Sequence, residues 1–336
     1  MASLSGTAAV SKTTDRRARA TNWVTQESVL AISIIVLGAV VSLINPNFMS
    51  ATNISNILNN SSYIAIAAIG MAMVIISGNI DISVGALIGL LATIGGRLAV
   101  GAAEGGYWIG WAYIIPIFVG VLVEAVIGFI VAYLRVPAIV VSLGMTSILR
   151  GGLILWTGGE WIYDLPREFM LAQQNVLGIP VPVIFMVILT IIAGLWLRYA
   201  PAGRAIYAVG GNKEAARLSG ISEKRVLMQV FMLNGLMVGF AAMMFATQFS
   251  AIQSTVPSGL ELLIITAAVV GGVSILGGTG TVIGSTLGAL LIHVIPNAMI
   301  FANISQYWQQ AVQGVLILFT VLVDLYRRRR QTYGKK

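Results

Sequence analysis

The sequence contains no cysteine, a single histidine and unusually little charge. Only 10% of its 336 residues are charged and 57% are hydrophobic, with a mean hydropathy of +0.90. A soluble domain carries about 25% charged residues. The missing cysteine excludes disulfides and thiolate metal sites, and one histidine excludes a histidine metal cluster. Too little polar surface remains for a soluble enzyme, a nucleic-acid-binding domain or a disordered chain, so the composition indicates an integral membrane protein.

The net charge of +8 comes from the two ends of the chain. Residues 1–20 contain four basic residues and one acid, and the segment after Leu325 contains six basic residues. Basic ends are typical of cytoplasmic tails beside anionic lipid, and they give no reason to expect a nucleic-acid partner. We therefore predict a cytoplasmic tail over residues 1–28, a transmembrane domain over 29–325 and a basic cytoplasmic tail over 326–336.

A spanning helix needs roughly 20 predominantly apolar residues, and the chain has room for about ten. The sequence predicts an all-α polytopic membrane protein with about ten transmembrane helices. The expected spans are residues 29–44, 61–77, 82–95, 112–133, 138–156, 181–197, 226–247, 260–276, 281–295 and 308–325. The segment Phe48–Asn60 is short and mildly amphipathic, and we expect a separate surface or re-entrant element there.

Loop charges predict the orientation of these spans. The loop 198–225 contains six Lys and Arg residues, whereas the loop 157–180 contains one Arg and three acids. Because basic loops stay in the cytoplasm, the loop 198–225 and both termini should share the cytoplasmic side. Six predicted spans precede that loop and four follow it, which is consistent with this topology.

The loop 198–225 holds a short helix signal. Asn212 suits an N-cap, Glu214 lies in the first turn, Arg217 lies near the end and Gly220 follows as a terminating glycine. Ala215 and Ala216 complete a Glu-Ala-Ala triplet that is followed, after three residues, by Gly220. The segment is either an ordinary surface helix or a coupling helix that docks into a soluble partner.

This segment resembles the EAA loop of ABC importer permeases, and with its flanks it is similar to the ribose-type sugar permeases. The other stretches that carry the resemblance are Gly78–Gly85 (GNIDISVG), Val136–Val140 (VPAIV) with Leu143-Gly144 and Arg150-Gly151, and Gly271–Gly280 (GGVSILGGTG) continued by Gly284 and Gly288. They occur in the same order as in the family and span about residues 29–325. The Ile and Leu-Pro that complete the EAA pattern are absent after Gly220.

The resemblance implies partners and a solute. It implies a separate ATP-binding cassette subunit that meets Asn212, Glu214–Arg217 and Gly220, a periplasmic sugar-binding protein and a second permease subunit, either the same chain or a relative. It places the chain in a bacterial inner membrane as a non-enzymatic subunit. The chain has no G-x-x-x-x-G-K-[ST] phosphate loop. We therefore expect no bound cofactor or metal, with ATP used by the partner.

The stretch Leu155–Ile162 with Leu165-Pro166 looks most like the corresponding loop of autoinducer-2 or rhamnose permeases. Ribose or another pentose is the alternative solute.

Polar residues within apolar runs are candidates for the translocation path. The candidates are Asn79, Asp81, Ser83, Glu124, Asn234 and Glu261. Asp81 is either a pathway residue or a cap of the helix that follows it, and Arg150 is a candidate counter-charge for Asp81 or Glu124. A rival hypothesis is an ion-coupled secondary transporter of a small polar solute that uses Asp81, Glu124 or Glu261 as its ion site.

Overall fold

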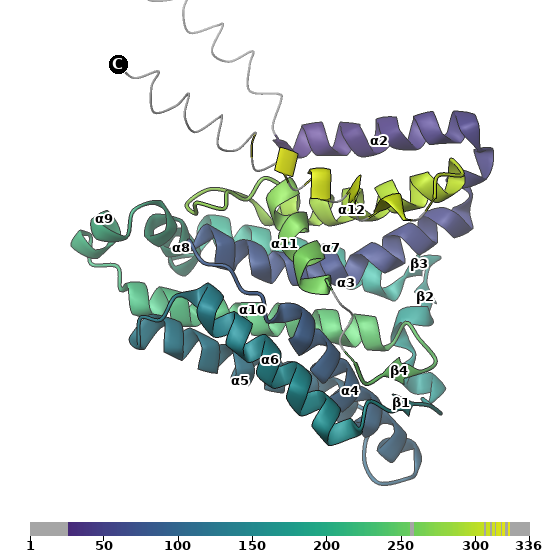
Figure 1. Cartoon of the computed structure of the whole chain (residues 1–336), viewed down its shortest axis with the longest axis horizontal. Helices are drawn as coiled ribbons and strands as arrows, with labels where there is room; N and C mark the ends of the chain where they lie inside the picture. The colour runs from purple at the N-terminus through teal and green to yellow at the C-terminus, as the bar shows by residue number, and fades with distance from the viewer. Residues whose placement is uncertain are drawn as a thin grey trace, which may run out of the picture.

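The computed structural model describes residues 26–255, 259–305, 307–309, 311–312, 314–316, 318–319 and 322, and it is largely helical (Figure 1). Eight helices in this part of the chain are long and apolar enough to cross a membrane. They are α2 (Gln26–Ile44), α3 (Ala51–Ile76), α4 (Val84–Ala103), α5 (Trp111–Tyr133), α6 (Ala138–Thr157), α7 (Val181–Tyr199), α10 (Glu223–Ala246) and α12 (Val282–Phe301). The prediction of an all-α polytopic membrane protein is confirmed.

The predicted separate element at Phe48–Asn60 is wrong. After a short 3-10 helix, η1 (Pro46–Met49), the chain enters α3, which runs without a break for 26 residues from Ala51 to Ile76. The Ser50 side chain accepts a hydrogen bond from the Asn53 backbone N–H and so starts α3 ahead of the polar segment. Asn53 is buried against Asn297 of α12, so polar pairing between helices explains the polar residues of this stretch.

The predicted span at residues 260–276 is also wrong. α11 (Leu260–Val270) has 11 residues, which is about 16 Å of helix and half of what a crossing needs. It is followed by a glycine-rich loop, residues 271–281, with positive φ at Gly272, Gly277, Gly278 and Gly280. This stretch is apolar because it is buried inside the protein, and not because it spans the lipid.

The predicted span at residues 308–325 lies partly outside the described residues. Without the span at 260–276, nine of the ten predicted spans remain, and eight of them correspond to the described helices. The span at 308–325 and the cytoplasmic location of the two termini, which lie outside the described residues, stay predictions. Within the described residues, the start of α2 and the start of α12 lie at the same end of the bundle as the beginning of the loop 198–225. The Thr281 hydroxyl donates to Glu27 near the start of α2, at 2.7 Å, and both residues line the same cleft as Arg198 and Arg204.

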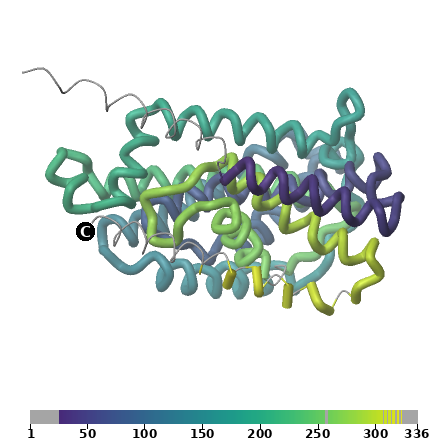
Figure 2. Tube along the Cα trace, turned by 90° about the horizontal axis from the view of Figure 1, so that it is seen from above, coloured from purple at the N-terminus to yellow at the C-terminus, as the bar shows by residue number. Residues whose placement is uncertain are grey.

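The core is centred on α3 and α10. In the most apolar window of α3, 83% of residues are buried, compared with 17% in α2 at the periphery. α10 packs mainly against α5, α3 and α4. Seen from above, α7 lies along one long edge and the α5–α6 pair along the other (Figure 2). The exposed surfaces of α2, α5, α6 and α7 carry large apolar side chains, as expected of helices that face lipid.

The two ends of the bundle differ. One end carries α8 (Pro201–Gly211) and α9 (Lys213–Leu218), which project beyond the long helices (Figure 1). The other end is covered by short elements: β1 (Trp161–Ile162) pairs antiparallel with β4 (Ile252–Gln253), and β2 (Asn175–Val176) pairs with β3 (Ile179–Pro180). The 3-10 helices η2 (Arg167–Phe169) and η3 (Leu171–Gln173) lie in the same loop. The basic loop 198–225 and the acidic loop 157–180 are therefore at opposite ends, as their charges predict.

Glycines let α11 and α12 approach backbone to backbone. A Cβ atom on Gly288 would overlap the Ala267 carbonyl, and one on Gly284 would overlap the Gly271 carbonyl. Helices in lipid gain little from hydrophobic association, so close contact through small residues holds them together.

We expect Gly288→Ala to destabilise the fold by about 1–3 kcal/mol, since the added methyl overpacks a rigid backbone contact. Gly152→Ala on α6 is the matched control because open space surrounds Gly152 among the described residues. The measurement is the thermal unfolding midpoint of the purified protein in detergent. Equal midpoints for the two variants would contradict the close packing.

Candidate translocation and coupling sites

The helix α9, in the basic loop 198–225, has the local structure that the sequence predicts. The Asn212 side chain accepts a hydrogen bond from the Ala215 backbone N–H at 2.9 Å. Arg217 forms an ion pair with Glu214 one turn earlier, and Gly220 ends the helix with φ +80°. Ala216 is buried, so this residue fixes α9 to the bundle, while the charged face is exposed. The coupling role of Asn212, Glu214, Ala215, Ala216, Arg217 and Gly220 stays a prediction.

Sequence reasoning missed one feature of α9. Leu218 ends the helix and is 81% exposed, although the helix is otherwise polar on its outer side. An apolar side chain flanked by Glu214 and Arg217 at the tip of a projecting helix is suited to a protein partner. The sequence signal that could have identified this feature is the single leucine that follows the charged residues Glu214 and Arg217.

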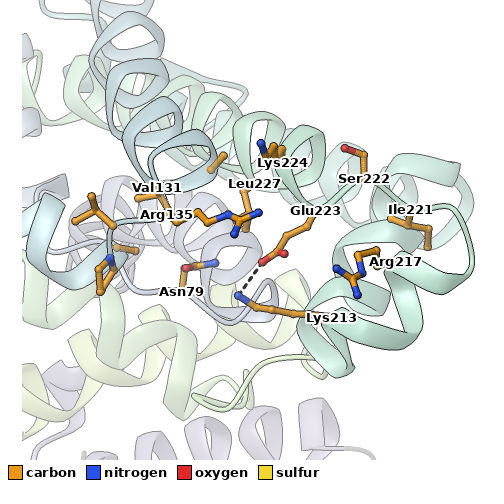
Figure 3. Close-up of a pocket in the computed structure, with 14 residues that line it drawn as sticks. Asn79, Val131, Arg135, Lys213, Arg217, Ile221, Ser222, Glu223, Lys224 and Leu227 are labelled. Atoms are coloured by element: carbon orange, nitrogen blue, oxygen red, sulfur yellow. Dashed lines mark ion pairs between the residues drawn. The ribbon is translucent and has the colours of Figure 1, made fainter.

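A cleft of about 570 Å³ lies beside α9 (Figure 3). Its walls come from the α5–α6 turn on one side and from α9 and the start of α10 on the other. The charged residues that line it are Arg135, Lys213, Arg217, Glu223 and Lys224. Lys213 forms an ion pair with Glu223 at 2.9 Å. The cleft is therefore basic on balance, and Asn79 reaches into it from the break between α3 and α4.

α8 connects this end of the molecule to the interior. A Cβ atom on Gly210 would overlap the carbonyl of Ile76, the last residue of α3. The same Ile76 carbonyl accepts a hydrogen bond from the Gly278 backbone N–H at 2.8 Å. The Tyr207 hydroxyl donates to the Gly280 carbonyl at 2.9 Å, and burial raises the pKa of Tyr207. The loop 271–281, the end of α3 and α8 are thus joined by direct backbone contacts.

The break between α3 and α4 is organised by Asp81. Its Oδ1 atom accepts hydrogen bonds from the Ser83 backbone N–H at 2.8 Å and from the Ser83 hydroxyl at 2.6 Å, which starts α4. Its Oδ2 atom accepts from the Asn234 amide of α10 at 2.8 Å. All three side chains are fully buried. Of the two hypotheses for Asp81, these contacts match the helix-capping one.

Glu124 of α5 completes this buried cluster. It lies near Asp81 and Asn234 and is fully buried. Its two carboxylate oxygens, and the Oδ1 atom of Asn234, make no hydrogen bond with any residue that the structure describes. Four of the six predicted path residues therefore come together: Asp81, Ser83, Glu124 and Asn234. Their place on the translocation path stays a prediction.

The other two candidates lie apart from the cluster. Asn79 forms a hydrogen bond with Ser77 and lines the cleft beside α9. Glu261, in the first turn of α11, forms an ion pair with Arg150 of α6 at 3.1 Å. The sequence offered Asp81 or Glu124 as the counter-charge of Arg150, and that prediction is wrong because α11 brings Glu261 to it. Glu261 also packs against Gly85, where a Cβ atom would meet the carboxylate.

Eight helices long enough to span a membrane, the short helix α11 packed among them and the projecting α8 and α9 define a multi-pass membrane protein. Residues 53–321 match the family model described as branched-chain amino acid transport system / permease component. The chain belongs to this family of permeases, and the resemblance inferred from its motifs is confirmed.

Relatives match over most of their length. The chain is 36% identical over 296 residues, 87% of this chain and 84% of the relative, to the autoinducer 2 import system permease protein LsrC of Enterobacter sp. (strain 638). It is 33% identical over 300 residues, 89% of this chain and 84% of the relative, to the LsrC protein of Yersinia pseudotuberculosis serotype O:1b (strain IP 31758). No solved structure matches the chain significantly.

We expect Asp81→Ala to lower the free energy of unfolding by about 1–3 kcal/mol for each buried donor left unpaired, here the Ser83 N–H and the Asn234 amide. Asp81→Asn should be milder, since an amide oxygen still accepts from Ser83, and its NH₂ group can donate to Asn234 Oδ1 once the Asn234 amide rotates by about 180°. The measurement is thermal unfolding in detergent, with Glu160→Ala in the exposed loop as control. An Asp81→Ala variant that unfolds at the wild-type temperature would disprove the capping role.

Proposed function

We propose that this chain is the membrane-spanning permease subunit of an ATP-binding cassette importer in a bacterial inner membrane. The observation that carries the proposal is α9, a capped helix with exposed Glu214, Arg217 and Leu218 at the end of the molecule opposite the strands. Its direct support is membership of the permease family and similarity to permease subunits of a named import system.

ATP hydrolysis is assigned to a separate ATP-binding cassette subunit that binds α9 and the adjacent basic cleft. A second permease subunit, the same chain or a relative, completes the translocation path. A periplasmic binding protein delivers the solute at the end covered by the strands. These partners follow from the importer class of the relatives.

The solute is proposed to be a sugar or sugar-like molecule. The curated relatives are named for the import of autoinducer 2, and the loop 155–166 resembles the autoinducer-2 and rhamnose permeases. Autoinducer 2 is the first solute to test, followed by rhamnose and ribose.

The contacts of α8 supply a mechanism. A push on α9 is passed to α8 and then, through the Gly210 and Gly278 contacts, to the end of α3 and the loop 271–281. The first is where α3 is followed by α4, and the second separates the short helix α11 from α12. Binding and hydrolysis of ATP would favour one arrangement of these breaks over the other, because the partner contacts differ between the two states.

The direct test is purification of the tagged chain from its host in mild detergent, with the co-purifying proteins identified by mass. We expect a stoichiometric ATP-binding subunit and solute uptake that stops when ATP is depleted. A chain that is folded and active in uptake but purifies alone, with uptake abolished by an uncoupler, would instead support the ion-coupled secondary transporter.

We expect Glu214→Lys combined with Gly220→Pro to reduce ATP-driven uptake by at least tenfold, because the charge pattern and the C-terminal end of α9 are both lost. The matched control is Glu104→Lys with Gly105→Pro, which alters an exposed helix end with φ +88° at the opposite end of the bundle. Uptake is measured in proteoliposomes with the partners present. Wild-type uptake by the α9 variant would refute coupling through this helix.

A further inference from the structure

The Arg150–Glu261 ion pair lies at a depth where charges are costly. Arg150 is 12 residues after the start of α6 at Ala138 and seven before its end at Thr157. At about 1.5 Å per residue these positions are about 18 Å and about 10 Å from the two helix ends. A bilayer has about 30 Å of hydrocarbon, so the pair falls within it.

The pair is also accessible. The Arg150 side chain is 36% exposed and the Glu261 side chain 13% exposed. Arg150 Nε and Glu261 Oε2 are buried atoms that make no hydrogen bond with the described residues, so the exposed part of the pair lies elsewhere on the two side chains. A charged pair with spare hydrogen-bonding capacity is not stable against lipid tails. The surface between α6 and α11 must therefore face water or another protein.

The outward surface of α6 agrees with this conclusion. Gly144, Ser147 and Gly151 are exposed on neighbouring turns, and the space around Gly144 and Gly151 is open among the described residues. Small residues at this spacing allow a further helix to approach closely. α6 and α11 both lie on the side of the bundle that faces the viewer in Figure 1, on the opposite side from α7 (Figure 2).

The contrast with the Asp81 cluster is informative. Asp81, Glu124 and Asn234 are enclosed by protein, so a solute cannot reach them in this conformation. The ion pair instead exposes about a third of the Arg150 side chain, whose guanidinium N–H groups can donate to hydroxyl oxygens, together with a small part of the Glu261 side chain.

We propose that the Arg150–Glu261 pair lies on the wall of the translocation path and binds the hydroxyl groups of the passing solute. This inference rests on the proposed function, and it assigns the path to the surface between α6 and α11, with the second permease subunit closing it from the other side. The ligand class is a small polyhydroxylated molecule.

The first experiment replaces the pair by apolar residues of similar size, Arg150→Met with Glu261→Met. Such a replacement leaves stability unchanged or improves it when an ion pair is only structural. We expect uptake of the solute at concentrations below the KM to fall by at least tenfold, while ATP hydrolysis, subunit co-purification and the unfolding midpoint are retained. Wild-type uptake by this variant would overturn the proposal.

A matched control removes another polar contact between helices. The hydroxyls of Thr190 on α7 and Thr286 on α12 are 2.9 Å apart and buried. Thr190→Val with Thr286→Val should leave uptake unchanged. The charge-reversed pair Arg150→Glu with Glu261→Arg restores the attraction, so this variant should fold. If the pair contacts the solute, its uptake should exceed that of the variant Arg150→Met with Glu261→Met.

A second experiment does not depend on uptake or on folding of the altered pair. Because the chain has no cysteine, a single introduced thiol reports its own surroundings. Ser147→Cys lies one turn from Arg150, and Leu262→Cys is next to Glu261; both native side chains are exposed. Ile188→Cys on α7 is the control, since Ile188 is 49% exposed among apolar side chains.

The assembled transporter in liposomes is treated with a charged methanethiosulfonate reagent, which reacts with thiols in water. We expect Ser147→Cys or Leu262→Cys to react and Ile188→Cys to resist. If neither thiol near the pair reacts faster than Ile188→Cys, the path lies elsewhere and the proposal fails. Because the labelling requires no ATP, this outcome is distinct from failure of the importer assignment, which the co-purification decides.

Discussion

A polar group at membrane depth is costly unless it finds a partner within the protein, since hydrocarbon offers none. This constraint bears most on the two loops that follow α3 and α11. The break after α3 is held by Asp81, which pairs with Ser83 and Asn234. The break after α11 is held by the hydrogen bond from Gly278 to Ile76. The loop after α11 therefore supplies a hydrogen-bond donor to the carbonyl of Ile76 at the end of α3. The two loops thus depend on each other.

The same contacts join the interior to the helices α8 and α9. A Cβ atom on Gly210 would overlap the Ile76 carbonyl, and one on Gly278 would overlap Gly211, so only glycine fits at these two positions. Under the proposed mechanism, a displacement of α9 reaches the end of α3 and the loop 271–281 through α8, which contacts both directly. Rigid contact over this distance is what a transporter driven from outside the membrane requires. An ion-coupled transporter would have no need for the exposed Leu218 or for the basic cleft beside it.

Asp81 and Glu261 differ in their surroundings. Asp81 is fully hydrogen-bonded and has a structural role that its contacts explain. Glu261 is paired with Arg150 but remains partly open to its surroundings. A partly exposed ion pair is more costly inside a membrane than a fully hydrogen-bonded acid. Such pairs occur in proteins where polar groups bind polar ligands. The difference between the two sites could be recognised only once burial and partners were known.

The sequence by itself determined the class of protein, most of the spanning helices, the separation of the basic and acidic loops and the local structure of α9. These depend on composition, on hydropathy over single segments and on capping residues a few positions apart, so local information suffices. The sequence wrongly predicted a span at 260–276, because the composition of a segment buried in protein is the same as that of a segment in lipid. It wrongly predicted a separate element at Phe48–Asn60, because polar residues that pair between helices have the composition of a surface segment.

Only the tertiary structure decided which charges pair. Arg150 and Glu261 are 111 positions apart, and nothing local distinguishes Glu261 from Asp81 or Glu124 as the partner of Arg150. The choice follows from the way α11 packs beside α6 and α4, which depends on contacts spread over the whole bundle. The close approach of Gly210, Gly278 and Ile76 has the same origin, since three distant segments must fold before their backbones can meet.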